Sequence, residues 1–199
     1  MRAAANPGCT LGYATLSIDG FIDLLRQHDI DAVADVRSQP YSRYTPEYSQ
    51  DQLKVALGEA GIQYVFMGKE LGARRDEPEC YVDGKVRYDL VAKTPAFRHG
   101  IDRLKKGRQK YRIALLCAEK DPITCHRSIL VSRELVKEDI DVQHILHNGS
   151  LEPHDQLEQR LLSSYGHDQE DLFDNQDARL ERAYRQQAEE IAFVREGEE

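Results

Sequence analysis

Long apolar runs are missing from this sequence. No stretch is long enough to cross the hydrocarbon core of a bilayer, and the first residues, MRAAANPGCT, lack the extended apolar stretch of a secretory signal. We therefore expect a cytoplasmic protein that makes no membrane contact. The sequence also shows no internal repeat, no GxGxxG pattern and no P-loop, so motifs give no support to a standard nucleotide-binding fold.

Cysteine is sparse. The four cysteines, at positions 9, 80, 117 and 125, form no C-x-x-C pair and do not resemble the dense framework of a small secreted domain. In a reducing compartment such residues stay thiols or bind metal. A disulfide between Cys117 and Cys125 remains open as a redox state.

The charge is acidic but uneven. The formal net charge is −8, and residues 167–199 hold eleven acidic residues against four arginines. The rest of the chain is therefore nearly neutral and need not repel an anion. We predict a single domain over residues 1–166, followed by an acidic, charged helical tail over residues 167–199. Whether that tail docks on the body, on a second copy or on a protein partner, or stays partly disordered, is left open.

Apolar runs alternate with segments of helical periodicity along the chain. Strands are predicted near residues 10–15, 30–36, 64–67, 113–116 and 142–146. Helices are predicted near residues 17–25, 49–60, 95–104, 128–137, 153–164 and 177–194. This alternation predicts an α/β fold with a mainly parallel central sheet of about five strands and helices on both faces. The strand order cannot be derived from it.

The stretch IALLCAEKDPITCHR, residues 113–127, carries most of the reactive residue types. It predicts a buried strand, a loop, and a helix beginning near Cys125. In a parallel sheet such a junction lies at the carboxyl ends of the strands, where ligands bind. We expect a catalytic group there, made of Cys117, Glu119, Cys125 and His126.

Cys125 is the strongest nucleophile candidate, because a helix start and the adjacent His126 and Arg127 would lower the pKa of its thiol. A small buried cysteine is an equally good interpretation. Cys117, at the end of an apolar strand, is more simply a residue that supports Cys125.

Several arginines follow the predicted strands: Arg37, Arg43, Arg74, Arg75 and Arg127. If they converge, they can bind phosphate or carboxylate in bidentate fashion, with Arg37 and Arg127 as the clamp. Each could equally be a solvated surface charge. Asp35, which ends an apolar strand, is either a general base or, as we prefer, the partner of a neighbouring arginine.

Two further interpretations stay open. Cys117, Cys125 and His126 could ligate zinc or iron, with Cys80, His99, His144 or Glu119 completing the shell, but only one adjacent ligand pair is present, so we expect no metal and no cofactor. Tyr41, Tyr44 and Tyr48 around Arg43 could stack nucleic-acid bases or pack over their own domain.

Taken together, the segments TLGYAT, DVRSQPYSRYTPEY, YVFMGKELGARR, CAEKDPITCHR and HIL resemble the bacterial and archaeal family known as domain of unknown function 488, over roughly residues 9–147. The resemblance implies an α/β fold and a shared polar site. That site would comprise Asp35, Arg37, Pro40, Ser42, Arg43, Gly72, Cys117, Glu119, Cys125, His126 and Arg127. It brings no established reaction. This chain has Gly12-Tyr13-Ala14 where members have Gly-His-Ser, and Ala73 where they have a second glycine.

We therefore predict an enzyme, a thiol-dependent hydrolase or transferase, that binds an anionic, phosphate-bearing substrate such as a nucleotide or nucleic acid. Its expected binding residues are Arg37, Ser42, Arg43, Gly72, Arg74 and Arg127. The alternative is a non-catalytic module for nucleic acid or protein, in which the Cys/His/Arg cluster is structural or binds a metal.

Overall fold

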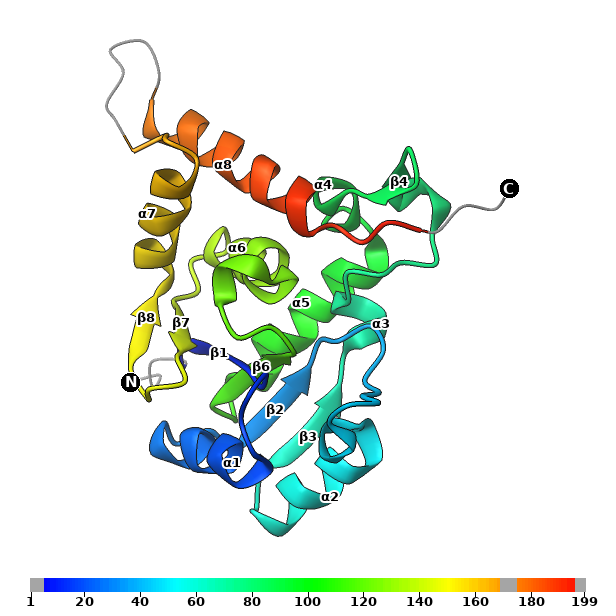
Figure 1. Ribbon diagram of the computed structural model, residues 1–199, viewed down its shortest axis with the longest axis vertical. Helices are drawn as coiled ribbons and strands as arrows, with labels where there is room; N and C mark the ends of the chain where they lie inside the picture. Colours follow the sequence, from blue (N-terminus) through cyan, green and yellow to red (C-terminus); the bar gives the residue numbers. More distant parts are fainter. Residues whose placement is uncertain (1–5, 169–174, 196–199) are drawn as a thin grey trace.

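The computed structural model describes residues 6–168 and 175–195, and its centre is a six-stranded sheet (Figure 1). The strand order is β3-β2-β6-β1-β7-β8, and every neighbouring pair is parallel except β7 and β8. The strands are β1 (Gly8–Gly12), β2 (Ala32–Asp35), β3 (Gln63–Phe66), β6 (Ile113–Cys117), β7 (Val142–Ile145) and β8 (Leu151–Pro153). The predicted mainly parallel α/β fold is confirmed. All five predicted strands are present, and β8 is the additional one.

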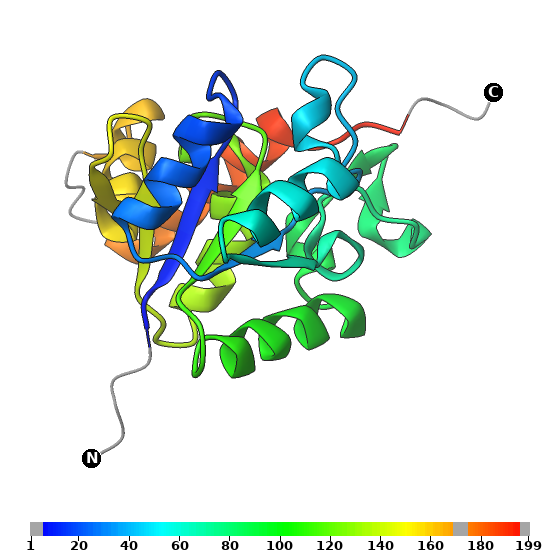
Figure 2. The same cartoon turned by 90° about the horizontal axis from the view of Figure 1, so that it is seen from below.

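Helices cover both faces of this sheet, as predicted (Figure 2). One hydrophobic core lies under α1 (Ile18–Gln27) and α2 (Gln50–Glu59), and receives Ala114 and Leu116 of β6. The other lies under α5 (Pro95–Gly107) and α6 (Arg133–Val136), and receives Leu115 and Cys117. Because side chains alternate along a strand, Cys117 lies on the α5 and α6 face.

The segment between β3 and α5, which lacked clear periodicity, is built from short elements. They are α3 (Gly68–Leu71), the 3-10 turn Pro78–Cys80, β4 (Tyr81–Val82), β5 (Lys85–Val86) and α4 (Tyr88–Val91). A second 3-10 turn, Pro46–Tyr48, precedes α2. The β4–β5 hairpin is a separate two-stranded sheet.

The helix after β6 begins next to Cys125, as predicted, but its first part is a π-helix. A 3-10 turn, Pro122–Thr124, comes first, Cys125 is extended, and the π-helix (Arg127–Ser132) continues as α6. Cys125 O accepts from Ser128 N at 3.0 Å and from Ile129 N at 3.1 Å, so Cys125 stands at the N-terminal boundary of the helix. Its thiol lies beside the positive end of the helix dipole.

Two helices close the chain, α7 (His154–Ser164) and α8 (Gln176–Ile191), and α8 extends from the end of α7 towards the β4–β5 hairpin (Figure 1). The predicted tail helix is thus present, although residues 169–174 and 196–199 of the predicted tail lie outside the described residues. Ala183 and Tyr184 are buried in the core beneath α5 and α6. The boundary at residue 166 stays a prediction, but α8 packs as part of the body.

The segment that follows α8 also pairs with the body. Val86 N donates a hydrogen bond to Phe193 O at 3.0 Å, and Arg195 N donates to Gly84 O at 2.8 Å. Within the ranges 6–168 and 175–195, no helix combines the length and the apolar character needed to span a membrane.

Candidate functional site

The carboxyl ends of three adjacent strands bring the predicted site residues together. β6 lies between β2 and β1, with Asp35 in register with Leu116 and Gly12 in register with Cys117. The loop that follows Cys117 therefore lies over the end of β1 and beside the end of β2. This is the strand edge at which α/β proteins bind ligands.

Two thiols share one imidazole nitrogen at this edge. His126 Nδ1 lies 3.6 Å from Cys117 Sγ and 3.9 Å from Cys125 Sγ. The other ring nitrogen, Nε2, lies 3.0 Å from the carbonyl oxygen of Val36. Because a carbonyl can only accept, Nε2 carries the hydrogen, and in the neutral ring the lone pair of Nδ1 faces both sulfurs.

The surroundings favour a thiolate at Cys125 and a thiol at Cys117. Burial raises the pKa of the Cys125 thiol, but the hydrogen bond from Cys117 and the charges of Arg127 and His126 outweigh it and hold that pKa well below its ordinary value. The hydrogen bond to Cys125, together with burial, raises the pKa of Cys117 well above its ordinary value. The pair therefore gives up its first proton readily and keeps the second.

Glu119 is the carboxylate of this cluster. Its Oε2 lies 3.0 Å from Cys125 Sγ, and burial followed by the nearby Cys125 raises the pKa of its carboxyl group. Burial alone would lower the pKa of His126, yet the hydrogen bond and charge of Cys125 and the charge of Glu119 raise it. Thiol, imidazole and carboxyl thus form one proton-sharing group.

A cavity of about 370 Å³ opens onto the cluster. Cys117, Glu119 and His126 line it, whereas Cys125 and Arg127 do not. Cys117 is therefore the cysteine of the pair that lines the cavity. The sequence favoured Cys125 as the nucleophile, and that assignment stays a prediction.

Asp35 and Arg37 form a buried pair beside the cavity. Arg37 donates from Nε and Nη2 to the two carboxylate oxygens of Asp35 at 2.9 and 2.6 Å, and from Nη1 to Tyr48 O at 2.8 Å. Tyr64 OH donates to Asp35 at 2.7 Å. These contacts favour the partner role that we preferred for Asp35. Arg37 lines the cavity, although Asp35 and Tyr48 already engage its guanidinium group.

Arg127 is completely buried and holds the site loop through hydrogen bonds to its backbone. Its Nη1 donates to Glu119 O at 2.7 Å, its Nη2 to Lys120 O at 3.3 Å, and its Nε to Thr10 Oγ1 at 3.3 Å. With its guanidinium engaged by three oxygens and outside the cavity lining, Arg127 is better placed to support the loop than to bind an anion. These contacts do not favour the predicted Arg37–Arg127 clamp, which stays a prediction.

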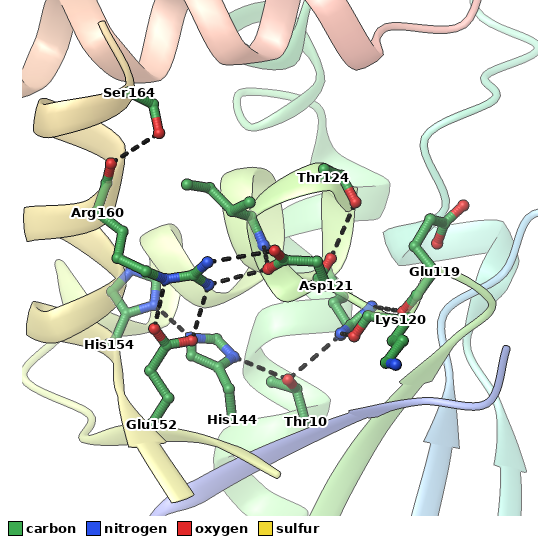
Figure 3. Close-up of polar contacts among 12 residues, drawn as sticks. Thr10, Glu119, Lys120, Asp121, Thr124, His144, Glu152, His154, Arg160 and Ser164 are labelled. Carbon is green, nitrogen blue, oxygen red and sulfur yellow. Dashed lines mark hydrogen bonds and ion pairs between the residues drawn. The ribbon is translucent and has the colours of Figure 1, made fainter. Parts of the chain in front are cut away.

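A buried hydrogen-bond chain continues from Arg127 to the surface, and Figure 3 shows its middle part. Thr10 Oγ1 lies 2.8 Å from His144 Nδ1, and His144 Nε2 lies 3.0 Å from His154 Nδ1. His154 Nε2 then lies 2.8 Å from Tyr184 OH, which donates to Glu158 at 2.9 Å. Since each group has one donor and one acceptor role, the chain runs in one direction and keeps both imidazoles neutral. Sequence reasoning did not find this chain, because its members come from β1, β7, α7 and α8.

The same loop is anchored from the α7 side. Arg160 Nη2 donates to Asp121 at 2.9 Å and to Glu152 at 3.0 Å, while Asp121 caps the turn by accepting from Ile123 N at 3.1 Å (Figure 3). The loop between Cys117 and Cys125 is thus fixed at both ends. A fixed loop presents its side chains with little reorganisation.

The other predicted binding residues lie around this centre. Arg74 is exposed, lines the main cavity, and lies over the ring of Phe193 with 4.6 Å between its guanidinium carbon and the ring centroid. Ser42 and Arg43 line a separate hollow of about 350 Å³, which shares Tyr41 with the main cavity. A Cβ atom on Gly72 would lie 2.3 Å from Gly68 O, so this glycine meets a packing requirement.

Tyr13 also lines the cavity, and the sequence gave no reason to expect it there. The Tyr13 ring stacks on the ring of Tyr48, with 4.0 Å between their centroids. The guanidinium carbon of Arg37 lies 5.2 Å from the centroid of the Tyr13 ring. The only sequence signal was the replacement of the family's usual Gly-His-Ser by Gly12-Tyr13-Ala14. Tyr13 therefore gives the cavity an aromatic side chain at this position.

Comparison with known proteins gives one match. A family model described as "Domain of unknown function DUF488" matches residues 17–134, which is more than half of the chain. The chain belongs to the DUF488 family. No curated protein and no solved structure matches it. The suspected resemblance is confirmed, and the matched residues include both cysteines and the histidine of the cluster.

Proposed function

We propose that this DUF488 protein is an enzyme that acts on an anionic, phosphate-bearing substrate, a nucleotide or a nucleic-acid segment, held in the cavity over the Cys117–His126–Cys125 cluster. One observation carries the proposal: Cys117, His126 and Glu119 share the lining of one cavity with Arg74, an exposed residue whose Nη1 also donates to Gln39 Oε1 at 3.1 Å. Reactive groups and a cation thus face the same space. This combination is more typical of a site that reacts with an anion than of a purely structural cluster.

In this proposal the two sulfurs act as a unit. The pair holds one thiolate: Cys117 lines the cavity, Cys125 loses its proton first, and His126 Nδ1 lies within reach of both sulfurs. Such an arrangement supports a thiol-dependent hydrolase or transferase. Glu119 shares protons with this cluster, and Arg127 holds the loop that carries it.

A second candidate, a non-catalytic nucleic-acid binder, is favoured by one observation. Tyr41, which lines the cavity, and Tyr44, three residues further along the chain, are 77% and 93% exposed. Exposed aromatic rings next to arginine stack bases without reading their sequence. In that case the cysteine cluster would contribute nothing to binding.

The test of the enzyme proposal is anion binding followed by thiol labelling. Phosphate, sulfate, nucleotides and short single-stranded oligonucleotides are titrated in a thermal-shift assay on the parent, on Arg74→Gln and on Arg26→Gln. Arg26 is the matched control, since it is exposed near the end of α1, at the opposite edge of the sheet. We expect an anion to raise the melting temperature of the parent and of Arg26→Gln, with about tenfold weaker binding in Arg74→Gln.

The labelling step separates the two candidates. A small alkylating reagent should modify the Cys117–Cys125 pair before Cys9 and Cys80 at neutral pH, and the bound anion should protect the pair. If no anion stabilises the parent, or if Arg74→Gln binds as well as the parent, the enzyme proposal fails. Oligonucleotide binding that survives in the double variant Cys117→Ser/Cys125→Ser and needs Tyr41 and Tyr44 would favour the binding module.

A further inference from the structure

Cys117, Cys125 and His126 are spaced like the ligands of a tetrahedral metal ion. Their ligand atoms all lie within 4.8 Å of one another. Zinc–sulfur bonds of about 2.3 Å and zinc–nitrogen bonds of about 2.0 Å at tetrahedral angles place sulfur and nitrogen about 3.5 Å apart. The observed separations from His126 Nδ1 are 3.6 and 3.9 Å. We propose that these three residues bind one zinc ion.

The ligands are oriented as a metal site requires. A zinc-bound histidine normally donates its other ring N–H to an oxygen, and His126 Nε2 lies 3.0 Å from Val36 O. A backbone N–H commonly supports a coordinating thiolate, and Arg127 N donates to Cys125 Sγ at 3.4 Å. The lone pair of Nδ1 and both sulfurs are therefore already oriented towards a common point without a bound metal.

Charge favours a soft divalent ion here. Two thiolates and a neutral imidazole around a dication sum to zero, which suits residues that are almost completely buried. Thiolate ligands select zinc over magnesium or calcium, which take oxygen ligands. Arg127 adds a positive charge next to the cluster, since its Nη1 donates to the backbone carbonyl of Glu119 at 2.7 Å.

The fourth position is within reach of the cavity. Glu119 Oε2 lies 3.0 Å from Cys125 Sγ, and Glu119, Cys117 and His126 all line the cavity. Three protein ligands with solvent in the fourth position are typical of a catalytic zinc site, whereas a carboxylate in that position would close the shell with four protein ligands. Among the described residues, Cys80, His99, His144 and Glu119 lie outside this ligand group, so the fuller shells considered from the sequence are not preformed.

The zinc site and the proposed function share one cavity. In no other respect does the zinc site rest on the proposed function. A bound zinc would use both sulfurs as ligands, so the metal would take the place of the thiol as the reactive centre. Anion binding at Arg74 does not depend on which of the two operates. The two proposals can therefore fail separately.

The experiment is a metal titration of the full chain. Protein is reduced, treated with chelator, and titrated without oxygen with zinc against a chromophoric chelator, and separately with cobalt. We expect one ion per chain, and thiolate-to-cobalt charge-transfer bands together with the visible bands of tetrahedral cobalt. Cys117→Ser, Cys125→Ser and His126→Gln should each weaken zinc binding roughly a hundredfold or more, and Glu119→Gln should weaken it less.

Cys80→Ser and Cys9→Ser are matched controls, because both remove a buried thiol outside the ligand group. They should bind zinc as the parent does. Should a ligand variant fail to fold, the cobalt spectrum of the parent still reports whether thiolates coordinate the ion. The site is refuted if the parent binds no zinc, if its cobalt spectrum lacks thiolate bands, or if the control variants lose zinc as the ligand variants do.

The anion titration is repeated on the metal-free and the zinc-loaded protein. Zinc binding without any anion effect keeps the metal site and overturns the proposed function. Anion binding without zinc affinity does the reverse.

Discussion

The backbone oxygen of Glu119 lies 1.7 Å from the point that a Cβ atom on Gly12 would occupy. The same oxygen accepts a hydrogen bond from Arg127 Nη1 at 2.7 Å. The loop that carries Glu119 is therefore seated directly on the last residue of β1 and held there from behind. Any side chain at position 12 has to move it.

Gly12→Ala should displace this loop, because the obstructing atom is backbone and cannot rotate away. We expect a loss of about 3 kcal/mol in the free energy of unfolding, measured by urea denaturation. Gly58→Ala is the control. A Cβ atom there meets nothing within 4 Å, and the helix α2 should gain about 0.5 to 1 kcal/mol. Equal stability in the two variants would show that the contact at Gly12 is not tight in solution.

Arg127→Lys should lower stability without changing anion affinity. Lysine keeps the charge but loses the planar fork that reaches Thr10, Glu119 and Lys120 together, which leaves buried oxygens unpaired. The expected cost is about 3 kcal/mol, measured by urea unfolding and compared with the exposed control Arg26→Lys. A variant that stays as stable as the parent and binds phosphate more weakly would restore Arg127 as an anion ligand.

Removing the ring of Tyr184 should destabilise the whole protein. The side chain is fully buried and bonds to both His154 and Glu158, so Tyr184→Ala should cost about 3 to 5 kcal/mol. Glu189→Ala, an exposed change on the same helix, should be neutral. For the same reason a chain ending at residue 166 should melt at a lower temperature, whereas a single domain over residues 1–166, as predicted from the sequence, would stay folded without the tail. An unchanged melting temperature would show that α8 contributes nothing to the stability of the body.

Stability should fall as the pH drops below about 6.5. Burial lowers the pKa of His154 to about 4 and that of His144 well below its ordinary value. A group whose pKa is depressed by folding contributes stability above its unfolded pKa, near 6.5, and loses that contribution as the pH falls towards the folded pKa. At pH 5.5 the expected loss is about 1.4 kcal/mol for each of these histidines.

The measurement is urea unfolding at pH 7.5, 6.5 and 5.5 for the parent and for His154→Gln. His126 acts in the opposite sense, because its raised pKa gives stability that is lost as the pH rises. The comparison between parent and variant removes that contribution. A variant with the same pH slope as the parent would mean that His154 is not held neutral by folding.

The sequence was informative where one short segment determines the geometry. An apolar strand followed by a polar loop and a helix places its loop at the carboxyl edge of a parallel sheet, so the grouping of Cys117, Cys125 and His126 could be predicted from residues 113–127 alone. Which of the two cysteines lines the cavity could not be predicted from this segment. That depends on the exit path of the loop, which is set by Arg127 from one side and by the close approach to Gly12 from the other.

Arginine roles were the least predictable. The guanidinium of Arg127 and that of Arg74 have the same chemistry, yet one is completely buried and the other exposed. The difference comes from strand order, because β1 beside β6 brings Thr10 within reach of Arg127. The docking of α8 was hidden for a related reason: an amphipathic helix shows that one face is covered, but its sequence does not say by what.

Ile191, the last residue of α8, and Phe193, which follows this helix, both line the cavity. A ligand that touches them gains contact energy only while this segment is docked, so occupancy and docking are thermodynamically linked and each must strengthen the other by the same factor. Resistance of the chain to proteolysis near its carboxyl end thereby becomes a reporter of whether the cavity is filled, for ligands that give no optical signal of their own.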